Sequence, residues 1–280
     1  MPLKWQCRGR ILDLSRPLVM GILNVTPDSF SDGGRYAGID AACERAAVMV
    51  AEGAAIIDVG GESTRPGAAG VSAQLERERV VPVIERIAAS LDVAISIDSS
   101  KPEVMAAAVD AGACLVNDVR ALRAPGARAW AAGAGVGVCL MHMQGEPRSM
   151  QESPAYHEVV SEVAEFLLRE RAACVAAGIR PEAIAFDPGI GFGKGHEHNL
   201  ALLKNLSHLA ALGSPLLVGL SRKSLIGRVL GRPVRERLHG GLGLAAWAVS
   251  AGARIIRTHD VAATRDAILM VSTVLEGTVT

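Results

Sequence analysis

The chain has few aromatic residues, no net charge and no paired cysteines. Phe, Trp and Tyr make up only 3% of the 280 residues, so Ala, Val, Leu and Ile must fill most of the interior. The 29 acidic residues balance the 29 basic ones, so no overall field would attract nucleic acid or an anionic membrane. Any anion-binding site must therefore be local.

Cysteine usage and the absence of long apolar runs restrict the setting of the protein. The five cysteines are isolated and form no CxxC pair, which favours reduced thiols over a disulfide framework. No apolar segment follows the charged N-terminus as it would in a secretory signal. The uncharged stretch 129–145 is too short to span a bilayer. We expect a soluble, cytoplasmic protein.

Apolar runs of strand length recur along the chain. They are continuous rather than alternating, which is typical of parallel strands buried on both faces. Each run ends in a polar or glycine-bearing cluster. The candidate strands are Leu18–Val25, Ala55–Gly60, Val93–Asp98, Cys114–Val119, Val136–Met141, Ala183–Asp187, Pro215–Leu220 and Ile255–Thr258.

Helical patterns separate these runs, so that strand and helix alternate throughout. Glycines follow several of the helical stretches, as left-handed caps would: Gly53, Gly112, Gly178, Gly213 and Gly252. The predicted helices are Ile39–Glu52, Ala73–Ser90, Pro102–Ala111, Ala124–Ala132, Tyr156–Ala177, His198–Leu212, Val234–Ala251 and Val261–Leu275.

This alternation predicts a single-domain (β/α)8 barrel over residues 1–280, with an N-terminal extension over 1–16 and the barrel over 17–277. A barrel of this kind uses about 250 residues. A doubly wound open sheet is the alternative, but it would gather polar ends at one switch point. The barrel instead places every strand end on one face, where its active site lies.

Acidic and amide side chains end several of the central strands. Asp98, Asn117 and Asp187 each stand at a strand end, and Met141 ends the strand between the last two. A carboxylate there is costly unless something donates a hydrogen bond to it, and an N-cap or an internal Arg partner could do so. A ring of such acceptors would also suit a flat heterocycle that presents parallel N–H donors.

Two long loops follow the first two strands. The first runs from Asn24 through Phe30 and Asp32, and the second carries Thr64, Arg65 and Pro66. Either could be a simple connection, but loops of this length in compact domains tend to be functional. Asn24 offers a neutral oxygen of the kind that suits Mg²⁺, and Thr64 and Arg65 could donate to anionic oxygens.

Cationic and hydroxyl side chains gather after the last two strands. Ser221-Arg222-Lys223-Ser224 follows one strand, and Arg257-Thr258-His259 ends the next. Barrels often bind phosphate there. The glycine-rich segment Gly189–Lys194 does not match a P-loop, and His196 with His198 lacks a third zinc ligand in sequence.

In chain order these motifs resemble the dihydropteroate synthase family of pterin-binding barrels. The matching stretches are Gly21–Gly34, Gly61–Gly67, Ser96–Ser99, Val116–Asp118, Asp187–Lys194, Ser221–Ser224 and Arg257–His259. The resemblance implies condensation of (7,8-dihydropterin-6-yl)methyl diphosphate with 4-aminobenzoate to 7,8-dihydropteroate, with Mg²⁺ and release of pyrophosphate. It also implies a homodimer, with the helices near the C-terminus and Trp247 as the expected interface.

The resemblance also assigns roles to residues. Asn24 would hold the metal, Thr64 would contact the diphosphate, and Arg257 with His259 would bind the leaving pyrophosphate. The pterin ring would lie against Asp98, Asn117, Asp187 and Lys223, with Met141 lining the pocket. The aminobenzoate site would be shaped by Phe30, Pro66, Phe192 and Ser224, with Arg65 and Ser221 as neighbours. Asp32 would stabilise a carbocation-like pterin, so no covalent enzyme intermediate is expected.

Sulfonamides, as mimics of aminobenzoate, are expected inhibitors, since Phe30 and Pro66 match the ordinary enzyme pattern. Two other functions remain open. A pterin-dependent methyltransferase that serves a corrinoid protein would share the pterin-facing residues but would have no use for the cationic set. A non-catalytic pterin-binding barrel would not require the two long loops.

Overall fold

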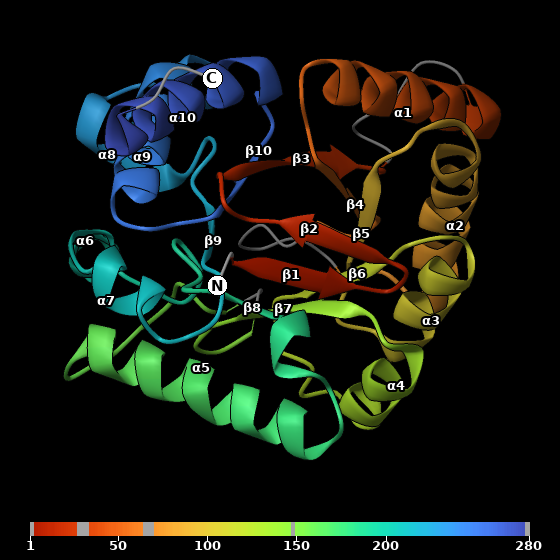
Figure 1. Cartoon of the computed structure of the whole chain (residues 1–280), viewed down its shortest axis with the longest axis horizontal. Coiled ribbons are helices and arrows are strands. Elements are labelled where there is room, and N and C mark those ends of the chain that lie inside the picture. The colour runs from red at the N-terminus through yellow and green to blue at the C-terminus, as the bar shows by residue number, and fades with distance from the viewer. Residues whose placement is uncertain (1–2, 27–33, 64–69, 147–148, 278–280) are drawn as a thin grey trace.

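The computed structural model describes residues 3–26, 34–63, 70–146 and 149–277 (Figure 1). After a hairpin of β1 (Lys4–Cys7) and β2 (Arg10–Asp13), strands and helices alternate around a central sheet. The sheet strands are β3 (Leu18–Asn24), β4 (Ile56–Gly60), β5 (Ala94–Asp98), β6 (Leu115–Asp118), β7 (Gly137–Met141), β8 (Ile184–Asp187), β9 (Leu217–Gly219) and β10 (Ile255–Thr258).

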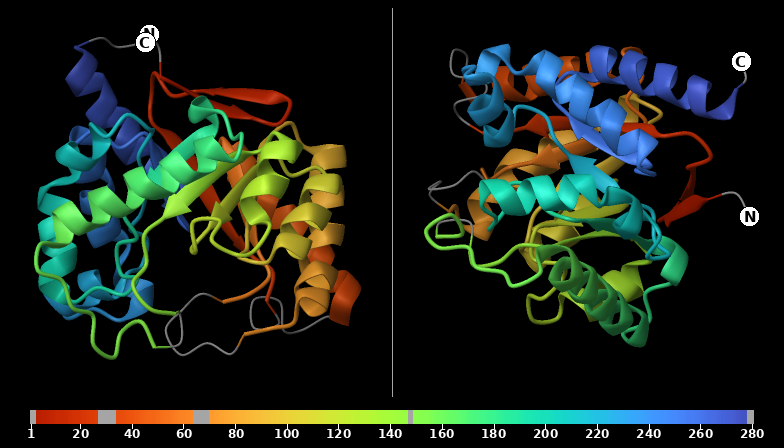
Figure 2. Two further views of the ribbon diagram at one scale, coloured as in Figure 1. Left: turned by 90° about the horizontal axis from the view of Figure 1, so that it is seen from below. Right: turned by 90° about the vertical axis from the view of Figure 1, so that its left-hand side faces the viewer.

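The helices surround this sheet (Figures 1 and 2). They are α1 (Gly34–Ala51), α2 (Ala73–Ser90), α3 (Pro102–Asp110), α4 (Ala127–Ala134), α5 (Val159–Ala176), α6 (His196–Lys204), α7 (Leu206–Ala210), α8 (Ser224–Leu230), α9 (Leu238–Ser250) and α10 (Val261–Glu276). Within the described ranges, no helix is both long and apolar enough to cross a membrane.

The central sheet is parallel and closes into a barrel. Its strand order is β8-β7-β6-β5-β4-β3-β10-β9. The two ends of that order meet where Phe186 of β8 forms a parallel bridge with Leu216 and its N–H donates to Pro215 O at 2.8 Å. The predicted (β/α)8 fold class is confirmed.

The N-terminal hairpin covers the end of the barrel where the strands begin. Trp5 is fully buried among the first residues of several strands, including Met20 and Ile255. Its indole N–H donates to Ala183 O at 3.0 Å. The hairpin was not predicted, because its two strands have four residues each and pair only with each other. With one end covered, the site can open only at the other.

Apart from shifts of a few residues at helix ends, the helix pattern differs from the prediction in two places. The helix expected over 198–212 is divided at Asn205 into α6 and α7. The helix expected from Val234 begins at Leu238, and the separate helix α8 precedes it. Gly231 adopts φ +65° and ends α8, and Pro233 lacks the N–H that a continuing helix would need. All five glycines predicted as caps have positive φ.

Candidate active site

One row of the sheet brings four strand ends together. Asn24 is paired with Gly60, Gly60 with Asp98, and Asp98 with Asn117 across the neighbouring strands β3 to β6. Neighbouring parallel strands in register keep their carboxyl ends at the same edge. Met141 and Asp187 form a corresponding pair on β7 and β8. The barrel therefore places these predicted residues around one opening.

Arg257 on β10 bridges two carboxylates across the barrel mouth. Its Nε donates to Asp58 Oδ2 at 2.6 Å, and its Nη2 donates to Asp98 Oδ2 at 2.6 Å. Asp58 is fully buried and also accepts from Asn117 Nδ2 at 3.1 Å. Asp58 lies inside a strand rather than at its end, so the pattern of polar strand ends does not point to it. The structure instead makes it the inner support of the site.

Of these side chains, Asp98, Asn117 and Arg257 line a cleft at the barrel mouth. Its lining combines apolar walls with a few convergent polar groups, as ligand pockets commonly do. Within the described part of the chain, Asp98 Oδ1 is buried and has no hydrogen-bond partner. That oxygen is therefore suited to accept from a ligand. The lining residues are Asp98, Asn117, Val119, Met141, Asp187, Ile190, Phe192, Gly219, Lys223 and Arg257.

Burial shifts the proton equilibria of the charged groups in this cleft. Burial raises the pKa of Asp98 to about 7, although Arg257 opposes the shift. The pKa of Asp187 is also raised by burial, against its hydrogen bond from Gly189. Burial lowers the pKa of Lys223 to about 8, while Asp187 opposes this. Perturbed pKa values of this kind mark functional sites.

Lys223, Phe192 and Asp187 form one wall of the cleft. The Lys223 ammonium lies 4.1 Å from the centroid of the Phe192 ring, within the range of a cation–π contact. The Asp187 carboxylate accepts from the N–H of Gly189 at 2.7 Å. A planar ligand in the cleft would thus meet an aromatic ring, an ammonium and a carboxylate.

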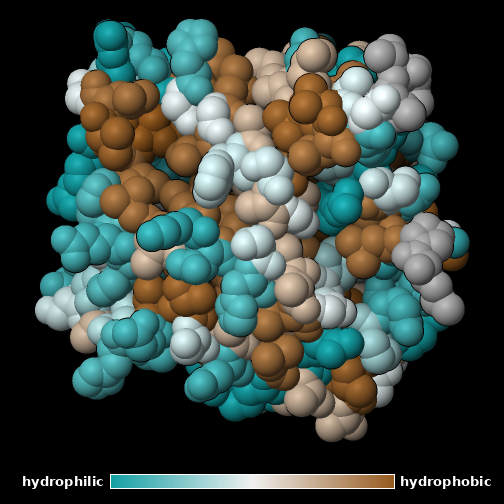
Figure 3. All heavy atoms as spheres, turned by 60° about the vertical axis from the view of Figure 1, so that its left-hand side comes forward, coloured by the Kyte–Doolittle hydropathy of each residue, from teal (hydrophilic) through white to brown (hydrophobic). Residues whose placement is uncertain are grey.

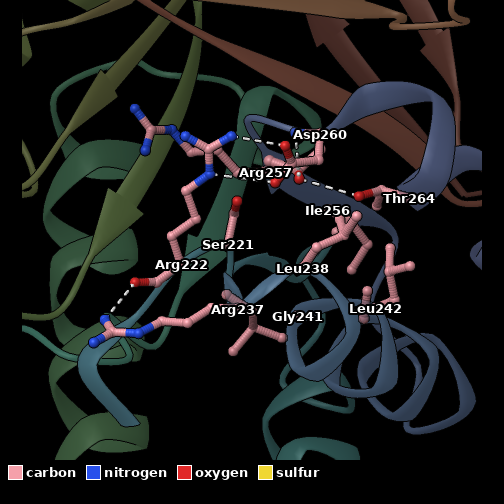
Figure 4. A pocket seen from close by; sticks show the side chains of 13 residues that line it. Ser221, Arg222, Arg237, Leu238, Gly241, Leu242, Ile256, Arg257, Asp260 and Thr264 are labelled. Atoms are coloured by element: carbon pink, nitrogen blue, oxygen red, sulfur yellow. Dashed lines mark hydrogen bonds and ion pairs between the residues drawn. The ribbon is translucent and has the colours of Figure 1, made fainter. Parts of the chain in front are cut away.

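A second set of polar groups joins the ends of β9 and β10 (Figure 4). Ser221 Oγ lies 3.0 Å from His259 Nδ1. Arg222, which has the unusual φ of +59°, forms an ion pair with Asp260 at 2.7 Å. Arg237 Nη1 donates to Arg222 O at 3.1 Å. These contacts fix the connection that carries Lys223 and Ser224, the latter being the first residue of α8.

Asn24 fits a magnesium ion in the chemistry of its side chain. A Cβ added at Gly60 would make van der Waals contact with Asn24 Oδ1 at 3.7 Å and with Asp98 Cβ at 3.6 Å, and the glycine leaves that position open. Mg²⁺ commonly takes one or two protein ligands and completes its shell with water and substrate phosphate. Among the described residues no cluster of three or more His, Cys, Asp or Glu could hold a metal.

Several predicted site residues cannot be placed. Phe30 and Asp32 of the first loop, and Thr64, Arg65 and Pro66 of the second, lie outside the described residues. The other predicted residues all follow or end a barrel strand. The sequence did not indicate that Asp58 and Lys194 belong to the site. Lys194 is buried and stands two residues after Phe192. Its place at the end of an apolar, glycine-rich segment was the one signal that it could be buried.

Comparison with known proteins identifies close relatives. A family model described as pterin binding enzyme matches residues 20–259. The dihydropteroate synthase of Escherichia coli K12 is 51% identical over 275 residues, which cover 98% of each chain. A Yersinia pestis dihydropteroate synthase solved with a sulfonamide drug has a TM-score of 0.93 at 50% identity, covering 98% of this chain and 99% of that one. A Xanthomonas albilineans dihydropteroate synthase solved with 4-aminobenzoic acid has a TM-score of 0.93 at 47% identity, with the same coverage.

Proposed function

The chain belongs to the dihydropteroate synthases, a family of pterin-binding enzymes, and from this premise we propose that it condenses (7,8-dihydropterin-6-yl)methyl diphosphate with 4-aminobenzoate. The products are 7,8-dihydropteroate and pyrophosphate. The observation that carries the proposal is the cleft in which Asp98, Asp187 and Asn117 face the cations Lys223 and Arg257.

The pterin ring is assigned to the acidic side of this cleft. A ring with an amidine-like edge presents parallel N–H donors, which one carboxylate can accept together. Asp187 and the unpaired oxygen of Asp98 supply such acceptors. Asn117 donates one of its two amide N–H groups to Asp58, so its second N–H and its amide oxygen can both contact the ring. Lys223 supplies a donor opposite them, and Met141 lines the pocket.

The diphosphate is assigned to the cationic side. A guanidinium has five N–H donors, and the two carboxylates engage Arg257 through Nε and Nη2. Among the described contacts Nη1 is left for an anion. His259, fixed beside Ser221, and Asn24 at the end of β3 lie on the same face of the barrel. When bound, Mg²⁺ would offset the charge that develops on the leaving oxygens.

The reaction proposed is a substitution at the methylene carbon that joins the pterin to the diphosphate. The bond from that carbon to the leaving oxygen breaks, the amine nitrogen of 4-aminobenzoate forms the new bond, and the amine loses a proton. Because this amine is a weak nucleophile, stabilising the leaving pyrophosphate matters most, which is the electrostatic task of Arg257 and His259. Asp32 of the first loop is proposed to stabilise positive charge on the pterin.

The aminobenzoate is assigned to the outer part of the cleft. Phe192 lines the cleft and Ser224 is exposed at the start of α8, whereas Ser221, Phe30, Thr64, Arg65 and Pro66 are proposed to complete the site. The Yersinia pestis relative was solved with a sulfonamide drug. We therefore infer that sulfonamides compete with 4-aminobenzoate for this protein, and a half-inhibitory concentration that does not rise with 4-aminobenzoate concentration would contradict that inference.

The assembly and location of the protein are inferred from its surface and thiols. Large apolar side chains are exposed along the last helices, and Figure 3 shows apolar side chains gathered on the side of the molecule that carries them. We define the C-terminal apolar surface by Val229, Leu230, Val234, Trp247, Leu269, Met270, Val274 and Leu275. We propose that a second copy covers this surface in a homodimer.

All five cysteines are free, which supports a reducing compartment such as the cytoplasm.

The pterin-dependent methyltransferase is disfavoured by the cationic side of the cleft, since that reaction has no pyrophosphate to bind.

The direct test is to mix the protein with Mg²⁺, dihydropterin diphosphate and labelled 4-aminobenzoate and to look for labelled dihydropteroate with an equal amount of pyrophosphate. Arg257→Ala should lower turnover strongly, whereas Arg16→Ala on the surface should not. Full turnover in Arg257→Ala would remove the assigned role.

A further inference from the structure

Lys194 is a buried lysine whose role is not explained by the site as described so far. It is 2% exposed, although lysine is seldom buried. Its ammonium lies within 3.1 Å of three carbonyl oxygens, those of His142, Gly189 and Phe192. It also lies 2.9 Å from His142 Nδ1. Because an ammonium has three donors, these acceptors can satisfy it without a carboxylate in contact.

The carbonyls around Lys194 come from two different connections. His142 follows β7, whereas Gly189 and Phe192 belong to the connection after β8. The two connections approach so closely that a Cβ at Gly189 would lie 1.9 Å from His142 O, and a Cβ at Gly193 would lie 2.2 Å from Gln144 O. The ammonium thus lies where two strand-to-helix connections meet, and its N–H groups donate to the carbonyl oxygens that converge there.

The segment that Lys194 holds is the one that forms a wall of the cleft. Phe192 N donates to Gly189 O at 3.0 Å, so residues 189–192 form a turn, and Lys194 bonds to the carbonyls at both ends of it. The Phe192 ring lies over the Lys223 ammonium. On the other side of the turn, Gly189 N donates to the carboxylate of Asp187. The turn therefore connects Lys194 to two groups that line the cleft.

We propose that Lys194 is a positioning residue of the substrate site, which holds the 189–192 turn so that Phe192 stays over Lys223 at the aminobenzoate side of the cleft. It does not contact the substrate. This inference rests on the proposed function for the identity of the ligands, but the geometry of the turn does not depend on it.

The test is a double-mutant cycle between Lys194 and Phe192. Lys194→Met keeps an unbranched apolar stem, one atom shorter than lysine, and removes the ammonium. If Lys194 acts through Phe192, it should raise the KM for 4-aminobenzoate by about tenfold in the wild-type background and by less than about twofold in a Phe192→Ala background, because coupled residues are not additive. An equal factor in both backgrounds would overturn the proposal, as would an unchanged KM with only a lower melting temperature.

Hydrogen exchange provides a readout that does not need turnover. Lys194→Met should speed amide exchange in a peptide that spans residues 189–193, whereas Lys204→Met, an exposed lysine at the end of α6, should leave it unchanged. Slow exchange retained in Lys194→Met would contradict the proposal. If the wild-type protein forms no dihydropteroate but the variants show this exchange pattern, the proposed function is refuted and the role of Lys194 in holding the turn is not. If Lys194→Met does not fold, Lys194→Gln, which keeps two N–H donors, carries the same cycle.

Discussion

Among single residues, the charged side chains inside the cleft determine one another's positions by how they pair. Arg257 joins Asp58 and Asp98, and so two carboxylates on neighbouring strands share one guanidinium. The sequence placed Asp98 and Arg257 on one face but could not show that they bond. Side-chain contacts across a barrel depend on strand register and on side-chain direction, which no local pattern encodes.

Asp58→Asn tests this pairing. The amide keeps a hydrogen-bond acceptor but removes the charge that faces Arg257, so we expect the free energy of unfolding to fall by about 2 kcal/mol. Urea denaturation measures it. The control is Asp92→Asn, which breaks an ion pair with Arg10 in which Asp92 is 92% exposed and should cost less than about 1 kcal/mol. Equal losses in the two variants would contradict the internal role of Asp58.

The lowered pKa of Lys223 predicts a pH dependence of substrate binding. Burial lowers this pKa to about 8, so the ammonium is present below pH 8 and is lost as the pH rises through that value. The KM for dihydropterin diphosphate should therefore increase above pH 8. Lys223→Arg keeps its charge over this range and should flatten the increase even if its KM is higher throughout. The same increase in Lys223→Arg would show that another group titrates.

At the scale of elements, the connection after β8 shows what sequence can and cannot predict. Its glycines indicate that another group approaches the backbone closely, and Gly191 does face Lys223, since a Cβ there would lie 3.3 Å from Lys223 Cδ. Gly189 and Gly193 instead make room for the backbone after β7. The glycine-rich composition indicated that some group lies close to this backbone. Which group it is depends on how connections that are distant in sequence pack together.

Two glycines with the same φ separate backbone strain from steric clash. Gly189 and Gly135 both have φ of +66°, so a side chain costs about 1–2 kcal/mol at either position. A Cβ at Gly189 would collide with His142 O, whereas one at Gly135 would meet nothing within 4 Å. Gly189→Ala should therefore lose turnover, and its melting temperature should fall much further than that of Gly135→Ala. Similar melting temperatures for the two variants would contradict the close contact of the two connections.

At the scale of the whole molecule, the barrel could be predicted because its signals are local and repeated. Each strand is a continuous apolar run, and each helix follows with its own periodicity, so eight repeats reinforce one interpretation. The hairpin over the barrel base and helix α8 were not predicted. The hairpin strands are too short to show a period, and α8 is also short, since it has 7 residues and ends at Gly231, before the helix that was expected from Val234.

The proposed homodimer is also tested at this scale. Met270 and Val274 on α10 are 64% and 76% exposed within the C-terminal apolar surface. A charge at either position would have to be desolvated in the interface, so Val274→Glu should convert a dimer into a monomer in light scattering coupled to gel filtration. Val48→Glu, on the exposed side of α1, is the matched control. A monomeric wild-type protein would contradict the assignment.

The most direct test of the central claim is a crystal structure of the protein with dihydropterin diphosphate bound. The pterin ring should lie in the cleft within hydrogen-bonding distance of Asp187 and Asp98, with its diphosphate directed to Arg257 and His259. A ring bound elsewhere, or a diphosphate directed away from Arg257, would contradict it.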